Sequence, residues 1–333
     1  MLDVDQVETF HQEGYLVVPN VLDNSDLDPV RREYESALEV AAKELFQMGE
    51  VSSAYADLPF EQRYITLITE CPGLFYYLGI SLPLDYETLD PHWIRLHSGP
   101  ALFGLLTNPK ILDIVESLIG PEIALNPVQQ TRMKPPQRLL AGALAEYSNV
   151  GATTWHQDFG AVMDDAVSTD LLTVWVAMTD ASQEMGCLAV MPRSHREEEL
   201  SLHCPGHRNP AENYIPQQTL ARHGVPAKPL PCEAGSIVLL TRWTEHGALS
   251  NTSNNLRWSF DLRYQPVGQP TGRPAFPTFT ARSNGDPDSV LVDPEDYAAL
   301  WEQTRQRLLA GSFDRPLYEQ ARWLANRDNP VCA

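Results

Sequence analysis

The segment Thr154-Trp155-His156-Gln157-Asp158 has the residue types and the spacing of a metal-binding site. On an extended strand, residues i and i+2 point to the same face, so His156 and Asp158 can present an imidazole and a carboxylate to one ion. Two other His-x-acid pairs occur, His11–Glu13 and His195–Glu197. The first falls at the end of an expected helix, where i and i+2 diverge, and the second in an expected polar loop, so neither is predicted to bind metal.

A third candidate ligand, His246, follows a predicted strand over residues 235–240. Together with His156 and Asp158 it forms two histidines and one carboxylate, the facial triad of non-haem Fe(II) oxygenases, which leaves metal positions open. Arg257 lies eleven positions after His246 on the next predicted strand, where it can clamp the carboxylate of a second ligand. Ser259, at i+2 from Arg257, can add a hydroxyl to that carboxylate. A chelating 2-oxo acid held at both ends fits this pattern.

These candidates belong to a chain that is helical in its first part and rich in strands after Gly120. Apolar residues at steps of three and four predict helices over residues 25–49 and 109–119. A shorter helix is expected over residues 5–12, with Asp5 as its cap, followed by a strand over residues 15–19. Short β-branched and aromatic runs predict strands over residues 123–133, 171–178, 236–240 and 256–264. Short strands between irregular loops favour a sandwich or barrel over a βαβ sheet.

Two long segments, residues 137–154 and 193–233, have the composition of loops, and loops of this length in a compact domain are usually lids or disordered. We call residues 193–233 the lid. A further helix is predicted from Pro294 to about Leu309, followed by a polar tail.

Composition excludes several function classes. The chain has 333 residues and a formal net charge of −20, which repels nucleic acid and anionic lipid surfaces. No apolar run is long enough to span a membrane, and the N-terminus has no basic region, so we expect a soluble cytoplasmic protein. The five cysteines contain no CxxC pair, and we expect five buried or inert thiols in a reducing compartment.

Several motifs occur in an order that resembles one protein family. The pieces are residues 10–18, Met133-Lys134-Pro135-Pro136, His156-Gln157-Asp158, residues 172–180, Met185-Gly186-Cys187-Leu188, residues 191–195, Glu233-Ala234-Gly235-Ser236, His246-Gly247 and Arg257. Residues from about 5 to 265 thereby resemble the phytanoyl-CoA dioxygenase family of Fe(II)/2-oxoglutarate oxygenases.

The resemblance implies a mainly β fold with flanking helices (α+β), whose core is a double-stranded β-helix, also called a jelly roll or cupin-like core. It implies one oxygenase domain over residues 1–333: a mainly helical part (1–120), the jelly-roll core with its lid (121–265), and a C-terminal extension with a helix (266–333). It implies a 2-oxoglutarate-dependent non-haem iron dioxygenase that uses O₂ and 2-oxoglutarate as co-substrates.

The resemblance also assigns site residues. His156, Asp158 and His246 bind iron and form the catalytic centre, and Arg257 holds the distal carboxylate of 2-oxoglutarate. Lys134 assists Arg257, although Arg132 faces the same side of its strand and can take that role instead. Trp175 lies near the co-substrate or is simply a core residue.

Two departures from the family pattern stand out. Ala248 replaces a common Ser or Thr two residues beyond the distal histidine, and Arg193 replaces a glycine in a tight turn. Asp158 is intact, which argues against halogenation, because halogenating relatives replace this carboxylate with a small residue.

Structural roles remain as alternatives. His156 and Asp158 can be a hydrogen-bonded pair, His246 a core histidine, and Arg257 the partner of a surface acid. We expect Arg263 to be a structural partner of Asp261 or Asp180. His203 and His207 lie in the lid and can touch substrate, although solvated positions are favoured.

The function predicted is hydroxylation of an unactivated C–H bond of a small organic substrate or secondary metabolite, with release of succinate and CO₂. An acyl-CoA hydroxylase of the same family, a cupin-type metal isomerase and a non-catalytic binding protein are the alternatives. No nucleic acid or membrane partner is predicted. Substrate identity and oligomeric state are not predicted.

Overall fold

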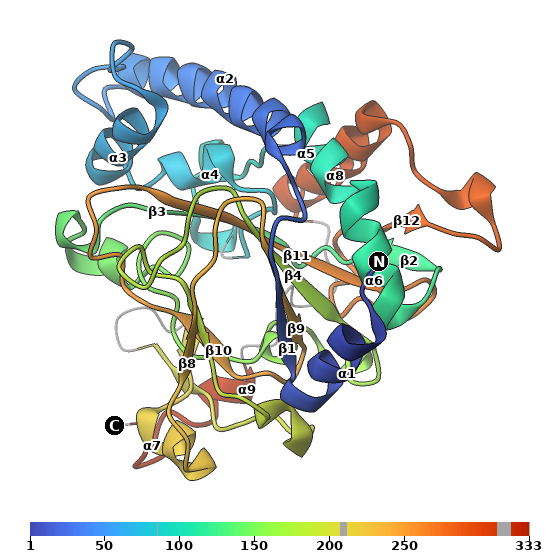
Figure 1. The fold of residues 1–333 in the computed structure, drawn as a ribbon. Coiled ribbons are helices and arrows are strands. Elements are labelled where there is room, and N and C mark those ends of the chain that lie inside the picture. Colours follow the sequence, from blue (N-terminus) through green and yellow to red (C-terminus); the bar gives the residue numbers. More distant parts are fainter. Residues whose placement is uncertain (85, 207–211, 312–320, 333) are drawn as a thin grey trace.

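Two antiparallel sheets form the centre of the structure, and helices from the first part of the chain cover the outer face of the larger sheet (Figure 1). The computed structural model describes residues 1–84, 86–206, 212–311 and 321–332. Its α-helices are α1 (Val4–Glu13), α2 (Asn24–Met48), α3 (Phe60–Glu70), α4 (Leu74–Leu78), α5 (Pro100–Leu106), α6 (Pro109–Ile119), α7 (Gln217–Leu220), α8 (Pro294–Leu309) and α9 (Ala321–Leu324). Its strands are β1 (Tyr15–Val18), β2 (Ile123–Leu125), β3 (Gln130–Lys134), β4 (Leu172–Ala177), β5 (Leu188–Val190), β6 (Cys204–Pro205), β7 (Asn213–Tyr214), β8 (Lys228–Leu230), β9 (Ile237–Thr241), β10 (His246–Ala248), β11 (Arg257–Pro266) and β12 (Phe279–Arg282).

The larger sheet has the strand order β1-β9-β4-β11-β2-β12, and β3 also pairs with β11. The smaller sheet has the order β10-β5-β8, and β6 and β7 form a separate hairpin. Every pair of neighbouring strands is antiparallel. This is the mainly β core with flanking helices that the sequence predicts.

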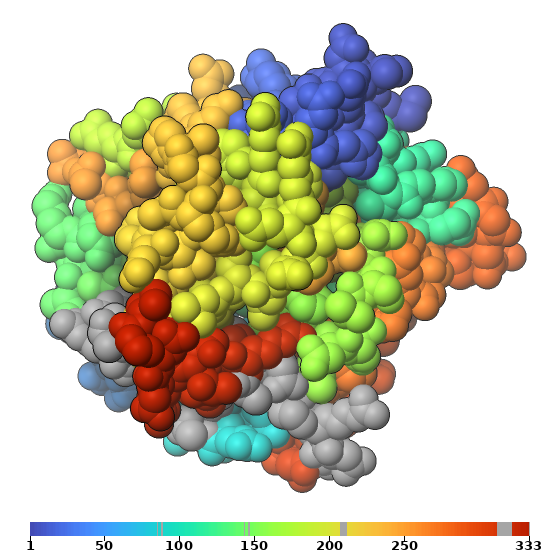
Figure 2. Space-filling view, turned by 90° about the horizontal axis from the view of Figure 1, so that it is seen from below, coloured from blue at the N-terminus to red at the C-terminus, as the bar shows by residue number. Residues whose placement is uncertain are grey.

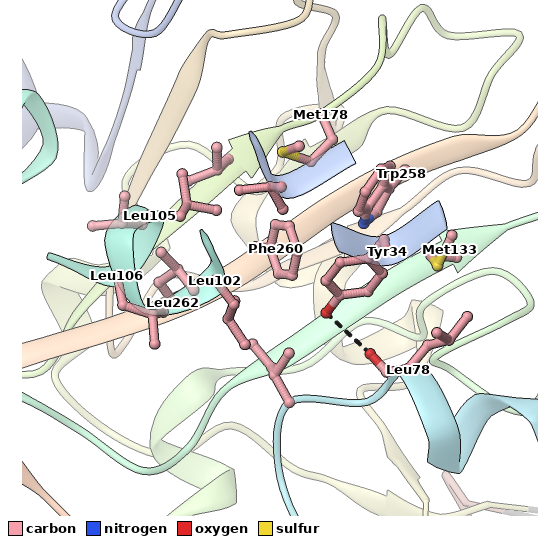
Figure 3. Packing of buried hydrophobic residues seen from close by; sticks show 14 of the residues in the cluster. Tyr34, Leu78, Leu102, Leu105, Leu106, Met133, Met178, Trp258, Phe260 and Leu262 are labelled. Carbon is pink, nitrogen blue, oxygen red and sulfur yellow. Dashed lines mark hydrogen bonds between the residues drawn. The ribbon is translucent and has the colours of Figure 1, made fainter. Parts of the chain in front are cut away.

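The long strand β11 separates two environments because its side chains alternate between its faces. Trp258, Phe260, Leu262 and Tyr264 point toward the helices, where the Tyr34 ring of α2 packs against Trp258 and Phe260 (Figure 3). The hydroxyl of Tyr34 donates to the carbonyl of Leu78 at 3.1 Å, which ties α2 to α4.

The opposite face of β11 points between the two sheets and carries a row of polar and charged residues that are nevertheless buried. These residues are Arg257, Ser259, Asp261, Arg263 and Gln265. A smaller apolar cluster fills the rest of the space between the sheets, with Trp175 and Val238 from the larger sheet and Leu188 and Val190 from the smaller. The candidate co-substrate residues therefore lie inside the sandwich.

The predicted helices over residues 25–49 and 109–119 correspond to α2 and α6, and the C-terminal helix to α8. The first helix begins earlier than predicted, and its cap is Asp3, not Asp5, because the Asp3 carboxylate accepts the backbone N–H of Gln6 at 2.8 Å. Helices α3, α4 and α5 were not predicted from the sequence.

One predicted strand and one predicted loop differ from the structure. The strand over residues 123–133 is two strands, β2 and β3, because the side chain of Asn126 accepts the Val128 N–H at 2.8 Å and turns the chain between them. The lid is not a plain loop, since it contains β6, β7, α7 and β8.

The expectation that all five cysteines are inert thiols is wrong for two of them. Cys204 in β6 and Cys332 near the chain end form a disulfide with a Cα–Cα distance of 5.4 Å, whereas Cys71, Cys187 and Cys232 are free. The C-terminal segment lies against the lid (Figure 2), where the Asn326 amide also donates to the carbonyl of His203 at 2.9 Å. A separation of 128 residues hides this pairing from any local motif.

A search for membrane spans finds no described helix with the length and apolar character that crossing a bilayer requires.

The disulfide leads to a prediction about stability. Closing so long a loop restricts the unfolded chain, so the Cys204→Ser, Cys332→Ser double variant should lose roughly 4–5 kcal/mol of unfolding free energy in urea titrations. Alkylation of the denatured protein should label the three free cysteines without reductant and all five after reduction. Labelling of five cysteines before reduction would contradict the pairing.

Candidate metal centre

The three predicted metal ligands lie together between the two sheets. The Asp158 Oδ1 atom is 3.7 Å from His156 Nε2 and 4.0 Å from His246 Nε2, and the candidate ligand atoms all lie within 4.8 Å of one another. The two histidines are backbone neighbours as well, because each N–H donates to the other's carbonyl, at 2.8 and 2.9 Å. This arrangement is close enough for one ion to contact all three side chains.

Gly247 permits this close approach of the two ligand segments. A Cβ atom at this position would lie 3.0 Å from the carbonyl oxygen of Thr153, so a side chain there would push the His246 strand away from the His156 segment.

Backbone carbonyls fix the tautomer of both histidines. The Nδ1 atom of His156 is 2.8 Å from the Thr154 carbonyl, and that of His246 is 2.9 Å from the Thr244 carbonyl. A carbonyl can only accept, so Nδ1 carries the proton and Nε2 presents its lone pair toward Asp158. Burial, together with the adjacent His246, lowers the pKa of His156 well below its ordinary value. His156 is therefore neutral, as a metal ligand requires.

Asp158 is held by two protein donors. Arg263 donates to Oδ1 and Thr173 to Oδ2, and the Arg263 guanidinium is itself anchored to the Val128 carbonyl at 2.9 Å. Burial raises the pKa of Asp158, but the charge and the hydrogen bond of Arg263 oppose that effect, and the pKa lies below its usual range. The prediction that Arg263 pairs with Asp261 or Asp180 is wrong, because Arg263 pairs with the candidate metal ligand itself.

Arg257 is a buried cation with donors to spare. It is fully buried, its Nη1 donates to the Ser259 hydroxyl at 2.8 Å, and its guanidinium lies 5.5 Å from the centre of the Trp175 ring. Its Nε and Nη2 atoms are buried without a hydrogen-bond partner among the described residues, as is the indole nitrogen of Trp175. Burial lowers the pKa of Arg257 to about 10, so it stays charged at neutral pH. Unused donors on a buried cation fit an anionic ligand.

Lys134 and Arg132 differ in how their charges are compensated. Arg132 donates to Asp261 at 2.5 Å and to the Ser148 carbonyl at 2.9 Å, so it already has an acidic partner. Lys134 lies opposite Arg257 on the neighbouring strand, and among the described residues its ammonium bonds the hydroxyl of Thr153, at 2.5 Å. Burial and the nearby Arg257 and Arg132 charges lower the pKa of Lys134 well below its ordinary value.

The residues present fit Fe(II) and 2-oxoglutarate. Two imidazoles and one carboxylate supply the facial set, and the same interior face carries Arg257 and Lys134, neither of which is ion-paired within the described part of the chain. A dianionic 2-oxo acid would supply the negative charge that both cations lack.

Two residues that sequence reasoning missed attach the lid to the metal ligands. Gln157 points away from His156 and Asp158, and its side chain bonds the backbone of Glu199, Ser201 and Trp243 at 2.8–3.0 Å. A residue between two metal ligands at positions i and i+2 of a strand faces away from the metal. This position is the only sequence signal that Gln157 bonds the lid.

Glu245, directly before His246, has the same role on the other ligand strand. Its fully buried carboxylate contacts His223 Nε2 at 2.8 Å, Arg222 at 2.6 Å and the hydroxyl of Ser201. All three partners belong to the lid, so the lid is bonded to the chain beside both histidine ligands.

The remaining lid histidines do not reach the metal centre within the described residues. His203 is buried, with its Nδ1 bonded to the Ser201 carbonyl at 2.7 Å and its Nε2 accepting the Gln157 N–H at 3.3 Å. Burial lowers its pKa to about 4. His207 lies outside the described residues.

A cavity of about 190 Å³ opens beside the ligands. His156 and Asp158 form one wall, Arg132 and Gln130 of β3 another, and apolar residues around α4 close the far end. Arg257 and Lys134 lie behind this cavity and do not line it, so the co-substrate residues are deeper in the sandwich than the open space.

Comparison with known proteins places the chain among related sequences. A family model described as phytanoyl-CoA dioxygenase (PhyH) matches residues 10–259. The phytanoyl-CoA dioxygenase domain-containing protein 1 of Danio rerio is 25% identical over 269 residues, which cover 77% of this chain and 88% of that protein.

Solved structures share the fold. The apo form of the non-heme monooxygenase ThoJ aligns with a TM-score of 0.52 and 16% identity, covering 92% of this chain and 98% of ThoJ. EvdO2 from Micromonospora carbonacea var. aurantiaca, in complex with 2-oxoglutarate, aligns with a TM-score of 0.50 and 18% identity over 80% of this chain and 92% of EvdO2. The jelly-roll fold is thus confirmed.

The hold on Asp158 can be tested by two substitutions. Thr173→Val removes the hydroxyl donor to Asp158 with little change in side-chain volume, and Arg263→Lys removes the guanidinium donor. Each variant should bind Fe(II) about 10- to 100-fold more weakly, because the carboxylate is no longer oriented. Anaerobic metal titration measures this. Arg282→Lys, whose partners Asp113 and Glu116 lie outside the metal centre, is the matched control. Wild-type metal affinity in both site variants would contradict the assignment.

Proposed function

The chain belongs to the phytanoyl-CoA dioxygenase family and is a 2-oxoglutarate-dependent non-haem iron dioxygenase, and we propose that it hydroxylates an unactivated C–H bond of a small organic substrate. One observation carries this proposal. The His156, Asp158 and His246 triad lies on the same interior face as Arg257, a buried cation whose Nε and Nη2 donors have no partner among the described residues.

In this proposal His156 Nε2, His246 Nε2 and one Asp158 oxygen hold the iron. The carbonyls of Thr154 and Thr244 keep a proton on each Nδ1, which preserves the donor lone pairs. Arg263 and Thr173 engage the two oxygens of the Asp158 carboxylate and would orient it toward the iron. Three protein ligands would leave coordination positions for the co-substrates.

Arg257 is proposed to bind the distal carboxylate of 2-oxoglutarate, because a carboxylate would accept from its unpartnered Nε and Nη2 atoms. Ser259 accepts from Nη1 and orients the guanidinium, and Trp175 lies against it. Lys134 is proposed as the second cation in preference to Arg132, whose charge Asp261 already compensates.

When bound, iron and 2-oxoglutarate supply the activation of O₂ that oxidises a C–H bond and releases succinate and CO₂. The protein positions the co-substrates and the substrate and excludes water from the site. The lid is bonded through Gln157 and Glu245 beside the ligands, and hydroxylation is the most direct outcome of such a site.

The size of the cavity supports a small substrate. A volume of about 190 Å³ lies below the roughly 300–1,000 Å³ typical of drug-sized ligand pockets, so a coenzyme A thioester does not fit the described cavity. We further propose that residues 1–333 act as one oxygenase unit, since α2, α5 and α8 share one apolar cluster with β11.

The metal assignment predicts loss of activity on truncation of a ligand. His156→Ala or Asp158→Ala should abolish succinate formation that depends on Fe(II) and a substrate, because the facial set is incomplete. A substrate panel that compares O₂ uptake with succinate release measures this. Turnover at the wild-type rate in either variant would contradict the assignment of that residue as a metal ligand.

The co-substrate assignment predicts a separate defect. Arg257→Met should weaken 2-oxoglutarate binding about 10- to 100-fold, as loss of charge-assisted hydrogen bonds implies, while metal binding stays unchanged. Anaerobic titration of the iron-loaded protein with 2-oxoglutarate measures the affinity. Arg282→Met, an arginine outside the sandwich, should bind like wild type.

A further inference from the structure

The cavity beside the metal ligands is lined by a half-buried acid, Glu212, that belongs to the lid. Its Oε1 accepts from the Ser148 hydroxyl at 3.1 Å, and no cationic side chain in the described part of the chain forms an ion pair with it. Burial raises the pKa of Glu212 despite the Arg132 charge nearby.

The other charged groups that line this cavity already have partners. Asp158 pairs with Arg263, Arg132 pairs with Asp261, and the Arg273 guanidinium donates to the Ala161 carbonyl at 2.9 Å. Glu212 is therefore the charged lining residue whose carboxyl group keeps acceptor capacity for a ligand. Its carboxyl group accepts from the hydroxyl and the backbone N–H of Ser148, and a partly desolvated carboxylate binds best to a further donor that carries positive charge.

The other residues that line the cavity determine what the rest of the ligand can be. Phe75, Leu82 and Leu84 give the cavity an apolar lining, and His156 and Asp158 line it as well. A small apolar body against these side chains would place a C–H bond toward the metal position while its polar end reaches Glu212.

We propose that the substrate is a small amine whose protonated nitrogen binds the Glu212 carboxylate and whose apolar part lies between α4 and the metal ligands. The inference rests on the proposed function, since it names the substrate class of the same site. It makes Glu212 a specificity-determining residue and gives a role to an acid of the lid that lines the cavity.

Three matched probes test the inference directly. Cyclohexylamine, cyclohexanol and cyclohexanecarboxylate share a ring and differ in charge, and their binding to protein loaded with Ni(II) and 2-oxoglutarate can be measured by calorimetry. The protonated amine should bind about tenfold or more tightly than the alcohol, and the carboxylate more weakly than both. Equal affinities, a reversed order or no binding of the amine would overturn the inference.

Variants assign the preference to one side chain. Glu212→Gln should remove the advantage of the amine and leave binding of the alcohol unchanged, whereas Glu199→Gln, an exposed lid acid that does not line the cavity, should behave as wild type. If the Glu212→Gln variant still binds the amine more tightly than the alcohol, another residue recognises the amine and the proposal is wrong. The wild-type ranking stands as a test even if the variant does not fold.

Binding of Ni(II) and 2-oxoglutarate is measured first, without any probe. Failure at that stage counts against the proposed function, whereas normal co-substrate binding with the wrong probe ranking counts against the amine alone.

Discussion

The burial of charge between two sheets is the constraint on which the rest of this structure depends. A charge removed from water costs several kcal/mol unless an opposite charge or a set of hydrogen bonds compensates it. Arg263 compensates Asp158 and Asp261 compensates Arg132, and these pairs hold β3, β11 and the metal segment in register. Arg257 and Lys134 have no such ion-pair partner within the described residues, and the unused donors of Arg257 fit an anion.

Much of the site could be predicted from the sequence because its signals are local. The alternation of His156 and Asp158, the position of His246 after a strand and the eleven-residue step to Arg257 need only strand geometry. The structure brings the three ligands together and places Arg257 and Ser259 on one face, as the pattern predicts. Amphipathic spacing likewise predicted α2 and α6 well, since each buries a single apolar stripe.

The rest depends on partners that are distant in the sequence. The sequence suggested Asp261 or Asp180 as the partner of Arg263, and only the folded sheet shows that Arg263 pairs with Asp158. The same holds for Glu245, whose partners lie in the lid, and for Cys204 and Cys332. Asn126 shows a different limit, because one side-chain hydrogen bond divides an otherwise continuous strand pattern in two. Local composition carries no information about which of several candidate partners a buried group meets.

The alternation along β11 restricts how this gene can change. Trp258 and Phe260 face the helices while Arg257 and Ser259 face the interior, so a shift of one residue exchanges the two sets. Gain or loss of a single codon between positions 257 and 264 would bury a guanidinium among the aromatic rings and place an indole beside the metal centre. Point substitutions remain open to evolution in this strand, whereas insertions and deletions of an odd number of residues are closed to it.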